Sequence, residues 1–509
     1  MILLIHKNKV VIEVLDLKTK AQLDFTLNKP IEVLFELANR FPNQILVWCE
    51  ATFKKALNID GIKTSFLLEN TMISYSKTNF LRDQIGYIED SPFLKVNKHV
   101  KYPTWLMSSC VGAIYSSQLL KFENKINYNT SFDFALNSIA KLGMPKGLFC
   151  YSEPQILKEK ISKNTNQSSV SELFRFVKLH YKSVWSFLLL LNFIIHERKF
   201  PLISFFKTLF IKKNNLNLSF DLKTINNNVI DKDVSIDVII PTLGRKAYVH
   251  DVLIDLSQQT KLPNQVVIVE QSELKETELD FIKNKPWPFK IIHEFINQTG
   301  ACNARNLALQ KVTSKYVYLA DDDNKFGNSL LENIISKMEE FNFKAISISY
   351  LQANEIEENK YAFQYSTFGG GSSVILSKYL KHIAFDMALE FGYGEDVDFG
   401  MQLRNLGADV IYVPDIKILH LKAPIGGFRT KFVHPWEMDK IKPKPSPTVL
   451  FNRIKNTTNK QLLGYKTTLF LKFYKNQNIK NPLKYLSNFK KQWNLSVSWA
   501  NQLKHKSQL

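Results

Sequence analysis

Apolar residues between Val234 and about Leu421 are spaced so that short strands and helices alternate along the chain. Runs rich in β-branched and aromatic residues predict buried strands, and apolar residues three or four positions apart predict helices. The predicted strands are Ser235–Ile240, Gln265–Val269, Lys290–Phe295, Lys315–Ala320, Lys344–Tyr350 and Asp409–Val413. The predicted helices are Ala247–Gln259, Ala301–Lys311, Ser329–Glu340 and Asp396–Asn405, the last with Gly407 as its left-handed cap. This alternation predicts an α/β fold with a mostly parallel, helix-covered sheet.

Residues 1–150 predict a separate α/β accessory domain in which no catalytic pattern is found. The opening run is apolar, but it is too short for a signal peptide and no basic segment precedes it, so it predicts a strand. The predicted strands are Met1–His6, Val10–Leu15, Gln44–Trp48 and Lys63–Leu68, and the predicted helix is Ile31–Asn39.

The segment Val170–Lys213 is more apolar than its surroundings. Its longest apolar runs, Ser183–Ile195 and Phe200–Phe206, are shorter than the roughly 20 residues that span a bilayer. Two helices lying in the membrane interface and two helices buried against a neighbouring domain explain the pattern equally well. The polar, asparagine-rich segment Asn214–Lys232 predicts a linker.

The whole chain has a net charge of +20. Its excess of basic over acidic residues is confined to two segments. Residues 421–509 contain 18 Lys or Arg against two acidic residues, and residues 151–230 contain 12 against five. Basic residues mixed with large apolar ones are typical of binding to anionic lipid surfaces. No zinc finger, RNP-like run or recognition-helix pattern points to nucleic acid. We therefore expect a protein bound peripherally to the inner face of the plasma membrane.

The remaining composition predicts an ordinary globular protein of the cytoplasm. Of its residues, 45% are hydrophobic and 22% are charged. The four cysteines (Cys49, Cys110, Cys150 and Cys302) are scattered without a Cys-x-x-Cys pair, which favours reduced thiols and argues against structural zinc. We expect an accessory domain (1–150), a helical segment with a linker (151–230), a central α/β domain (231–430) and a basic helical tail (431–509) with exposed aromatic residues (Phe470, Phe473 and Trp493).

Three aspartates end the predicted strand in Tyr316-Val-Tyr-Leu-Ala-Asp-Asp-Asp-Asn324. Adjacent carboxylates repel one another, so a cation is expected to hold them together. The carboxyl ends of strands are also where open α/β sheets bind ligands. A Mg²⁺ or Mn²⁺ ion carrying a phosphorylated ligand fits both observations, because these cations prefer oxygen ligands. Taken alone, the triplet is better explained as a solvated acidic turn, and the segments that follow reverse that preference.

Three further segments belong to the same predicted edge. Val238–Arg245 is a strand interrupted by Pro241 and followed by Gly244, and the next strand ends at Glu270. The loop Asn297–Asn306 enters a helix, with Gly300 at its start and Arg305 inside it. A helix N-terminus with an arginine is a natural phosphate site, although Arg305 pairing with Asp322 or Glu270 is an equal alternative.

Two later segments complete the pattern. In Phe391-Gly-Tyr-Gly-Glu-Asp-Val-Asp-Phe399, Glu395 and Asp396 begin a helix whose dipole favours an ionised carboxylate, as a general base requires. Helix capping is the simpler alternative for this pair, and Asp398 is expected to cap or to face solvent. His420 follows at a strand end, where it is suited to bind a metal. The glycines of Phe368–Ser373 predict either a bend or a wall of a ligand pocket.

In this order the motifs resemble the family 2 glycosyltransferases with the GT-A fold, over about residues 234–430. The resemblance implies that Asp323 ligates a divalent cation, Mn²⁺ or Mg²⁺, and that Asp321 contacts the nucleotide, the metal or both. It also implies that Thr242 and Glu270 hold the base and ribose, and that Asp396 is the catalytic base. The implied donor-binding residues are Pro241, Thr242, Arg245, Glu270, Gly300, Arg305, Asp321, Asp322 and Gly370. The implied catalytic residues are Glu395 and Asp396, and the implied metal ligands are Asp321, Asp323 and His420.

The resemblance implies a metal-dependent, inverting transfer of a sugar from a nucleotide sugar to a hydroxyl group of a growing surface glycan or a lipid-linked acceptor. One base without an enzyme nucleophile means a single displacement, whereas glycoside hydrolases use two carboxylates. A nucleotidyltransferase and a catalytically inactive membrane-bound scaffold are the alternatives. Residues 1–150 are left with three alternatives: binding of acceptor glycan, a decayed sister of the catalytic domain, or dimerisation.

Overall fold

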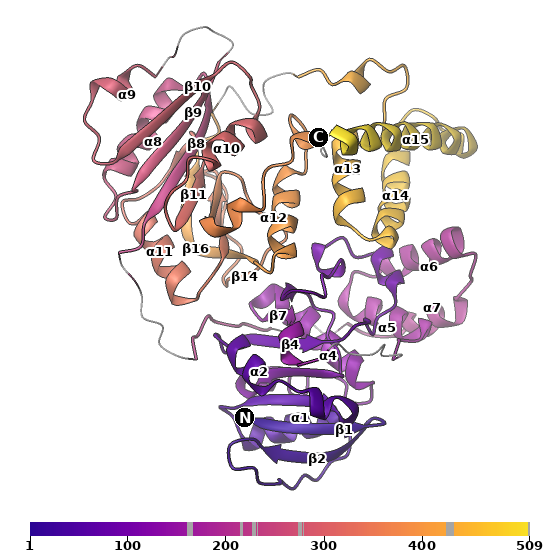
Figure 1. Ribbon diagram of the computed structural model, residues 1–509. Coiled ribbons are helices and arrows are strands. Elements are labelled where there is room, and N and C mark those ends of the chain that lie inside the picture. The colour runs from indigo at the N-terminus through magenta and orange to yellow at the C-terminus, as the bar shows by residue number, and fades with distance from the viewer. Residues whose placement is uncertain are drawn as a thin grey trace. The chain divides into compact units, whose positions relative to one another are not determined.

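The computed structural model describes residues 1–159, 166–213, 217–225, 231, 233–272, 277, 279–423 and 432–506 (Figure 1). The chain forms two units. Unit 1 contains residues 1–227, 361–364 and 457–472, and unit 2 contains residues 228–360, 365–456 and 473–509. The helical segment after residue 150 therefore belongs to unit 1, and the C-terminal helices are shared between the units. The predicted boundaries at residues 230, 430 and 431 lie outside the described residues.

The sheet of unit 2 has the strand order β10-β9-β8-β11-β15-β13-β16-β12. Neighbouring strands from β10 to β11 are parallel, as are β13 and β16, whereas β15 is antiparallel to both of its neighbours and β12 is antiparallel to β16. The bounds are β8 (Ile236–Leu243), β9 (Gln265–Gln271), β10 (Lys290–Ile296), β11 (Tyr316–Ala320), β12 (Asn324–Lys325), β13 (Ala345–Leu351), β15 (Ser372–Leu376) and β16 (Val410–His420). The predicted α/β fold with a mostly parallel sheet is confirmed, and β12 and β15 are additions to it.

Pro241 does not interrupt its strand, contrary to the prediction. Strand β8 continues through it to Leu243, paired with β9. Pairing of β8 with β11 ends at Ile239, so the amide hydrogen that Pro241 lacks is not needed on that side. The end of β8 therefore extends past β11 at the carboxyl edge of the sheet.

The helices of unit 2 cover its sheet and continue into the C-terminal region. Their bounds are α8 (Lys246–Ser257), α9 (Phe281–Asn284), α10 (Ala301–Leu309), α11 (Leu330–Glu340), α12 (Glu395–Asn405), α13 (Pro447–Asn456) and α15 (Pro482–Lys506). Helix α10 packs Ala304 and Ala308 against Ile239 and Val267 in the core, and α12 adds Phe399 to the same cluster. Gly407 adopts the predicted left-handed conformation, with φ of 82°.

The aromatic residues of the C-terminal tail are less exposed than predicted. Trp493 in α15 is 6% exposed, and its ring centroid lies 6.3 Å from that of Phe489. Phe470 and Phe473 are half-buried. The prediction failed because a basic helix keeps its charges in water while turning its aromatic face inward, and composition does not reveal that division.

Unit 1 has its own sheet, with the order β2-β1-β3-β6-β4-β7-β5. The strands are β1 (Ile2–Lys7), β2 (Val10–Asp16), β3 (Ile45–Glu50), β4 (Thr71–Tyr75), β5 (Tyr102–Pro103), β6 (Val111–Tyr115) and β7 (Phe149–Ser152); the two-residue β14 is Phe363–Gln364. The helices are α1 (Pro30–Arg40), α2 (Ile59–Ser65), α3 (Ser116–Leu120), α4 (Phe132–Gly143), α5 (Val170–His180), α6 (Val184–Glu197), α7 (Leu202–Leu209) and, mostly in this unit, α14 (Asn459–Tyr474). The boundary predicted after residue 150 falls inside β7.

Two predictions for unit 1 were wrong. The predicted strand Lys63–Leu68 overlaps α2, because the Asn58 side chain accepts the Gly61 N–H at 3.2 Å and caps a helix there. The predicted linker Asn214–Lys232 is described over residues 217–225, and there Phe220 is fully buried. The rest of that linker lies mainly outside the described residues.

Helices α5, α6 and α7 are packed on one side, as the alternative of buried helices predicted, and their place in a membrane interface stays a prediction. The inner faces are buried, with Phe174 at 0% and Phe193 at 1% exposure. The outer faces carry exposed large apolar side chains, among them Ile203 at 73% and Phe210 at 88%. No helix within the described ranges is long and apolar enough to cross a membrane.

Candidate active site at the carboxyl edge of unit 2

The three aspartates after β11 have three different environments. Asp321 is half-buried, and one of its carboxylate oxygens lies 3.1 Å from Arg305 Nη2. Arg305 comes from α10 and is 9% exposed. The arginine thus pairs with Asp321, rather than with Asp322 or Glu270, and faces the edge at which a ligand is expected.

Asp322 is turned into the protein. It is 2% exposed, accepts a hydrogen bond of 2.7 Å from Thr242 Oγ1 and forms an ion pair with Arg245. Burial raises the pKa of the Asp322 carboxyl to about 6, although the Arg245 guanidinium acts in the opposite direction. In this arrangement Asp322 holds the end of β8 and the start of α8 against β11. That Thr242 and Arg245 contact a donor stays a prediction.

Asp323 lies beside His420, as predicted for a metal pair. Strand β12 begins at Asn324, which pairs with His420 of β16, and this bridge brings His420 Nε2 to 3.5 Å from Asp323 Oδ2. The backbone N–H of Ala423 also donates to Asp323 Oδ2, at 2.9 Å. Strand β12 could not be predicted, because two residues are too short to show a periodic pattern.

Tyr350 is a site residue that the sequence did not reveal. It lies at the end of β13 with its hydroxyl 3.4 Å from Asp321 Oδ2 and 3.5 Å from Asp323 Oδ1. Its ring stacks on His420 with a centroid distance of 4.4 Å. Burial, followed by the two carboxylates, raises the pKa of the Tyr350 hydroxyl, so this group remains a donor between them. Its place at a predicted strand end, like that of Asp321, was the available signal.

The donor set at this edge fits a cation that is held only partly by protein. Among the described residues, no group of three or more His, Cys, Asp or Glu side chains is placed to hold a metal ion. Asp323 and His420 offer one carboxylate and one imidazole, with the Asp321 carboxylate linked to them through Tyr350. Mg²⁺ commonly takes one or two carboxylates from the protein and its remaining ligands from water and substrate phosphates. The residues present are compatible with that mode of binding.

Asp396, the predicted base, lies at the start of α12 close to Arg305. The N–H of Gly370 donates to Asp396 Oδ1 at 3.1 Å, which joins the glycine-rich segment before β15 to this helix. Burial raises the pKa of the Asp396 carboxyl to about 7, Arg305 acts against this rise, and Glu395 adds to it. Burial also raises the pKa of the Glu395 carboxyl. Burial thus acts against the ionised form that the helix dipole favours, and the role of this pair stays a prediction.

Asp398 neither caps a helix nor faces solvent. It is fully buried, and Asn456 and Lys455 of α13 donate to its carboxylate oxygens at 2.7 and 2.9 Å. Asp398 thus ties α12, which carries the predicted base, to the first C-terminal helix. Sequence alone could not connect two segments nearly 60 positions apart.

Glu270, at the end of β9, has a partner from the neighbouring strand. Its Oε2 lies 2.7 Å from His293 Nε2 of β10 and accepts a bond of 2.5 Å from Thr277 Oγ1. The carboxylate is 2% exposed. His293 was not predicted, although its position on the strand after β9 was a usable signal. Whether Glu270 holds a ribose stays a prediction.

The start of α10 is occupied by a carboxylate of the chain itself. Glu390 accepts hydrogen bonds from the N–H groups of Cys302 and Asn303, at 3.0 and 2.8 Å. A phosphate would reach these groups only after displacing Glu390, so the structure does not support the phosphate role expected of the helix start at Gly300. Gly300 has φ of 141°, and a Cβ there would lie 2.4 Å from Glu390 Oε2, so a side chain is excluded.

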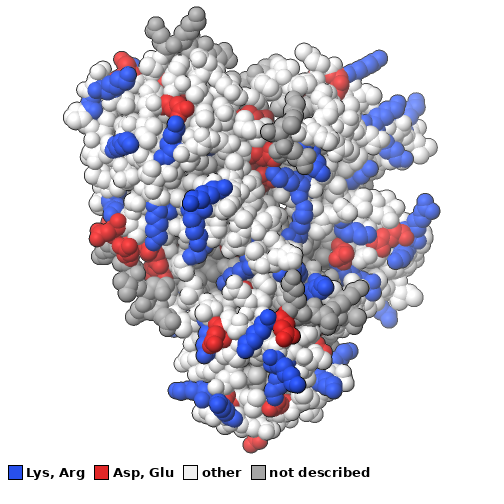
Figure 2. All heavy atoms as spheres, in the orientation of Figure 1, with Lys and Arg blue, Asp and Glu red and all other residues white. Residues whose placement is uncertain are grey.

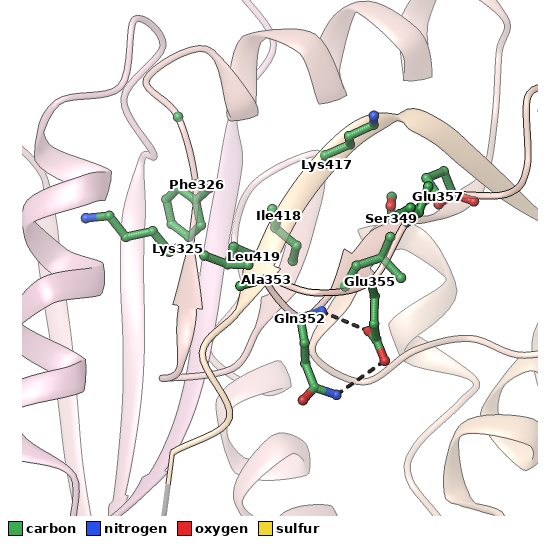
Figure 3. Close-up of a pocket in the computed structure, with 13 residues that line it drawn as sticks. Lys325, Phe326, Ser349, Gln352, Ala353, Glu355, Glu357, Lys417, Ile418 and Leu419 are labelled. Atoms are coloured by element: carbon green, nitrogen blue, oxygen red, sulfur yellow. Dashed lines mark hydrogen bonds between the residues drawn. The ribbon is translucent and has the colours of Figure 1, made fainter.

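A pocket of about 570 Å³ lies next to the site (Figure 3). Its lining includes Lys325, Ser349 and Leu419, the immediate strand neighbours of Asn324, Tyr350 and His420. Successive side chains of a strand point to opposite faces, so this pocket opens away from the carboxylates. None of the predicted site residues is among the described residues that line it.

Comparison with known proteins finds similarity within this domain. Residues 237–383 match the family model described as glycosyl transferase family 2. An uncharacterized glycosyltransferase of Rickettsia bellii is 28% identical over 131 residues, which are 26% of this chain and 18% of the relative. One of Rickettsia felis is 27% identical over 124 residues, or 24% of this chain and 20% of the relative. The match therefore spans about a fifth of the length of these curated relatives.

Two solved structures are also similar to parts of the chain. S. aureus TarS 1–349 in complex with UDP-GlcNAc has a TM-score of 0.36 and 14% identity, over 52% of this chain and 81% of that one. GalNAc-T7 with UDP, GalNAc and Mn²⁺ has a TM-score of 0.32 and 14% identity, over 37% of this chain and 44% of that one. At these scores the likeness carries no argument about the site. Residues 237–383, which lie in the α/β sheet of unit 2, are thus similar to glycosyl transferase family 2.

Proposed function

We propose that this protein transfers a sugar from a nucleotide-sugar donor to a hydroxyl acceptor, with a divalent cation and with inversion at the anomeric carbon. The observation that carries the proposal is the position of Asp396. Its carboxylate accepts the N–H of Gly370, and Arg305, close by, pairs with Asp321 at 3.1 Å. A candidate base and a candidate diphosphate site thus lie at one edge of one sheet.

The donor side of the site is rich in groups that suit phosphate. Bound between Asp323 and His420, Mn²⁺ or Mg²⁺ would act as a Lewis acid toward the nucleoside diphosphate leaving group. Arg305 is buried, and its Nε has no hydrogen-bond partner among the described residues. An arginine with an unused donor next to carboxylates is well placed for a phosphate oxygen.

Asp396 acts on the acceptor side. It takes the proton from the acceptor hydroxyl while that oxygen bonds to the anomeric carbon and the bond to the diphosphate breaks. A pKa of about 7 suits a general base at neutral pH, because such a group is partly ionised and still basic. In the absence of an enzyme nucleophile, the acceptor attacks from the side opposite the leaving group, and the anomeric configuration inverts.

We propose that the acceptor is a growing surface glycan or a lipid-linked glycan, reached at an anionic membrane surface. Helices α6 and α7 and the residues next to their ends expose Phe187, Phe200, Ile203, Phe206 and Phe210, each at 54% or more. The same segment carries the basic residues Lys182, Arg198, Lys199, Lys207, Lys212 and Lys213. Figure 2 shows Lys and Arg side chains projecting where Figure 1 labels these helices. Apolar side chains among lysines suit the interface of an anionic bilayer, on the cytoplasmic side.

A donor screen tests the catalytic proposal. The full chain is incubated with UDP-, GDP- and dTDP-sugars and MnCl₂, and release of the nucleoside diphosphate and binding are measured, with Asp323→Ala as the control. We expect saturable binding of one donor that is lost with a chelator or in the variant. Release of pyrophosphate in a parallel incubation with nucleoside triphosphates and sugar phosphates would favour a nucleotidyltransferase. Absence of metal-dependent binding of any donor would favour an inactive scaffold.

A further inference from the structure

Unit 1 repeats the central strand arrangement of unit 2. Five strands of unit 1 lie in the order β1-β3-β6-β4-β7, and five of unit 2 in the order β8-β11-β15-β13-β16. Numbered along the chain, both orders are 1-2-4-3-5. The successive pairings are parallel, antiparallel, antiparallel and parallel in unit 1, and they are the same in unit 2. A mixed sheet of five strands can have many orders and directions, so agreement in both is a specific similarity between the two units.

Register extends the match to single residues. Cys49 of β3 pairs with Val111 of β6, and Ala320 of β11 pairs with Ser372 of β15, at the corresponding ends of the two antiparallel pairs. The residue before Val111 therefore corresponds to Gly371, and the one before that, Ser109, corresponds to Gly370.

Two hydrogen bonds outside the ladders follow this register. Ser108 N donates to Ser74 Oγ at 3.0 Å in unit 1, and Gly369 N donates to Ser347 Oγ at 3.4 Å in unit 2. Likewise Thr104 N donates to Cys150 O at 3.0 Å, and Tyr365 N donates to Val410 O at 2.8 Å. The acceptors in each pair lie on corresponding strands, so the likeness includes the loops as well as the sheet.

The match reaches the candidate base. Ser109 N donates to Asp133 Oδ1 at 2.7 Å, just as Gly370 N donates to Asp396 Oδ1 at 3.1 Å. Asp133 is the second residue of α4 and Asp396 is the second residue of α12, and each helix lies between the two last strands of the matching set. Asp133 thus occupies in unit 1 the position of Asp396 in unit 2.

Most of the aspartate triplet is missing from the matching described positions of unit 1. The positions of Asp321, Asp322 and Asp323 hold Glu50, Ala51 and Thr52. Asp322 and Asp323, the second of which is a predicted metal ligand, therefore have no carboxylate counterpart.

Asp133 itself is closed to an acceptor. It is 2% exposed, and its carboxylate also accepts Ser109 Oγ at 2.8 Å and Asn166 Nδ2 at 2.7 Å. The carboxylate oxygens of Asp133 are thus used in hydrogen bonds to Ser109 and Asn166. At the matching position in unit 2, Asp396 is half-buried and faces the site.

We infer that unit 1 is a second GT-A-type domain that no longer transfers sugar, that its Asp133 is a structural residue, and that the chain has a single donor site, in unit 2. The single-site part of this inference rests on the proposed function of unit 2. Of the three alternatives for residues 1–150, the matched register selects the decayed sister of the catalytic domain.

Donor stoichiometry tests the inference without a variant. The full chain is titrated calorimetrically with UDP, GDP and dTDP in MnCl₂. We expect one binding site per chain for the nucleotide that binds, and two sites would overturn the inference. Zero sites for all three nucleotides would overturn the proposed function, and the paired alanine variants then decide the role of Asp133.

The paired variants are Asp133→Ala and Asp396→Ala. Removing Asp133 takes the acceptor away from the buried N–H and hydroxyl groups of Ser109. We therefore expect Tm to fall by roughly 2–8 °C while kcat stays within about twofold of the parent. Asp396→Ala should abolish turnover with a smaller change in Tm. An Asp133→Ala protein with parental Tm would overturn the inference, whether or not it kept its turnover. If Asp133→Ala does not fold, Asn166→Ala replaces it, because this variant removes only one donor to Asp133. We expect a smaller fall in Tm at unchanged kcat, and an unchanged Tm would contradict the structural role of Asp133.

Discussion

His420 Nε2 lies 3.5 Å from Asp323 Oδ2, although 97 positions separate the two residues along the chain. The two-residue strand β12, which starts directly after Asp323, pairs with the end of β16 and creates this proximity. An imidazole and a carboxylate in this arrangement can share one cation, and no third protein ligand is needed when phosphate supplies the others.

The metal pair makes the first prediction. Asp323→Ala should abolish Mn²⁺-dependent turnover, and His420→Ala should raise the Mn²⁺ concentration needed for half-maximal activity by about 10-fold or more, because a ligand is at least as important as its supporting residues. A Mn²⁺ titration of donor hydrolysis measures both effects. Parental Mn²⁺ dependence in His420→Ala would remove this residue from the metal site.

Asp396 makes a prediction about pH. Its pKa is raised to about 7, so the carboxyl is protonated and inactive as a base below that pH, and kcat should rise as pH increases from 6 to 8. Asp396→Asn should lower kcat by roughly 10²- to 10⁴-fold and remove this acidic limb while leaving donor affinity nearly unchanged. A pH–rate profile and a donor titration of both proteins check this. An unaltered acidic limb in the variant would assign the titration to another group.

Gly371 makes a steric prediction. A Cβ at this position would lie 2.0 Å from Asp321 Oδ2, so Gly371→Ala must push Asp321 away from Arg305. We expect at least a 10-fold loss of kcat/KM for the donor. The matched control is Gly327→Ala, since a Cβ there meets nothing within 4 Å, and it should keep parental kinetics and Tm.

Tyr350 offers a test of the residue that sequence reasoning missed. Tyr350→Phe keeps the ring on His420, at the 4.4 Å centroid distance, and removes the hydroxyl near Asp321 and Asp323. We expect a loss of a few-fold in kcat/KM, in line with the roughly 0.5–1.5 kcal/mol of one hydrogen bond. Tyr350→Ala should lose more, because it also frees His420. Equal kinetics for the two variants would show that only the hydroxyl matters.

The membrane surface is tested by co-sedimentation with vesicles. Ile203→Glu combined with Phe210→Glu should abolish binding to anionic vesicles, because both side chains are more than 70% exposed and flanked by lysines. Ile356→Glu, at an 84% exposed site in unit 2, is the control and should bind normally.

A second set of variants addresses the C-terminal region. Changing Lys and Arg to Glu within residues 441–509 should also abolish binding if this basic region contacts lipid, and unchanged binding would refute that part of the proposal. Equal binding of the parent chain to neutral and anionic vesicles would contradict the electrostatic contribution as a whole.

Strong local patterns determined much of the central domain. Apolar runs of β-branched and aromatic residues before Asp321 and Glu270 were sufficient to predict β11 and β9, because a buried strand is apolar along most of its length. The helices that follow were predicted for the same kind of reason, since their apolar spacing and caps are local. The order of the motifs then indicated the family.

Only the tertiary structure decided how the polar groups are shared. Asp322 faces Arg245 inside the protein, whereas the adjacent Asp321 faces Arg305, and no local pattern distinguishes two neighbouring aspartates. Contacts between distant segments also place Glu390 at the start of α10. They likewise give Asp133 and Asp396 matching positions in the two units. The physical reason is that strand and helix periodicity is written in neighbouring residues, whereas burial, ion pairing and register arise only when separate segments pack together.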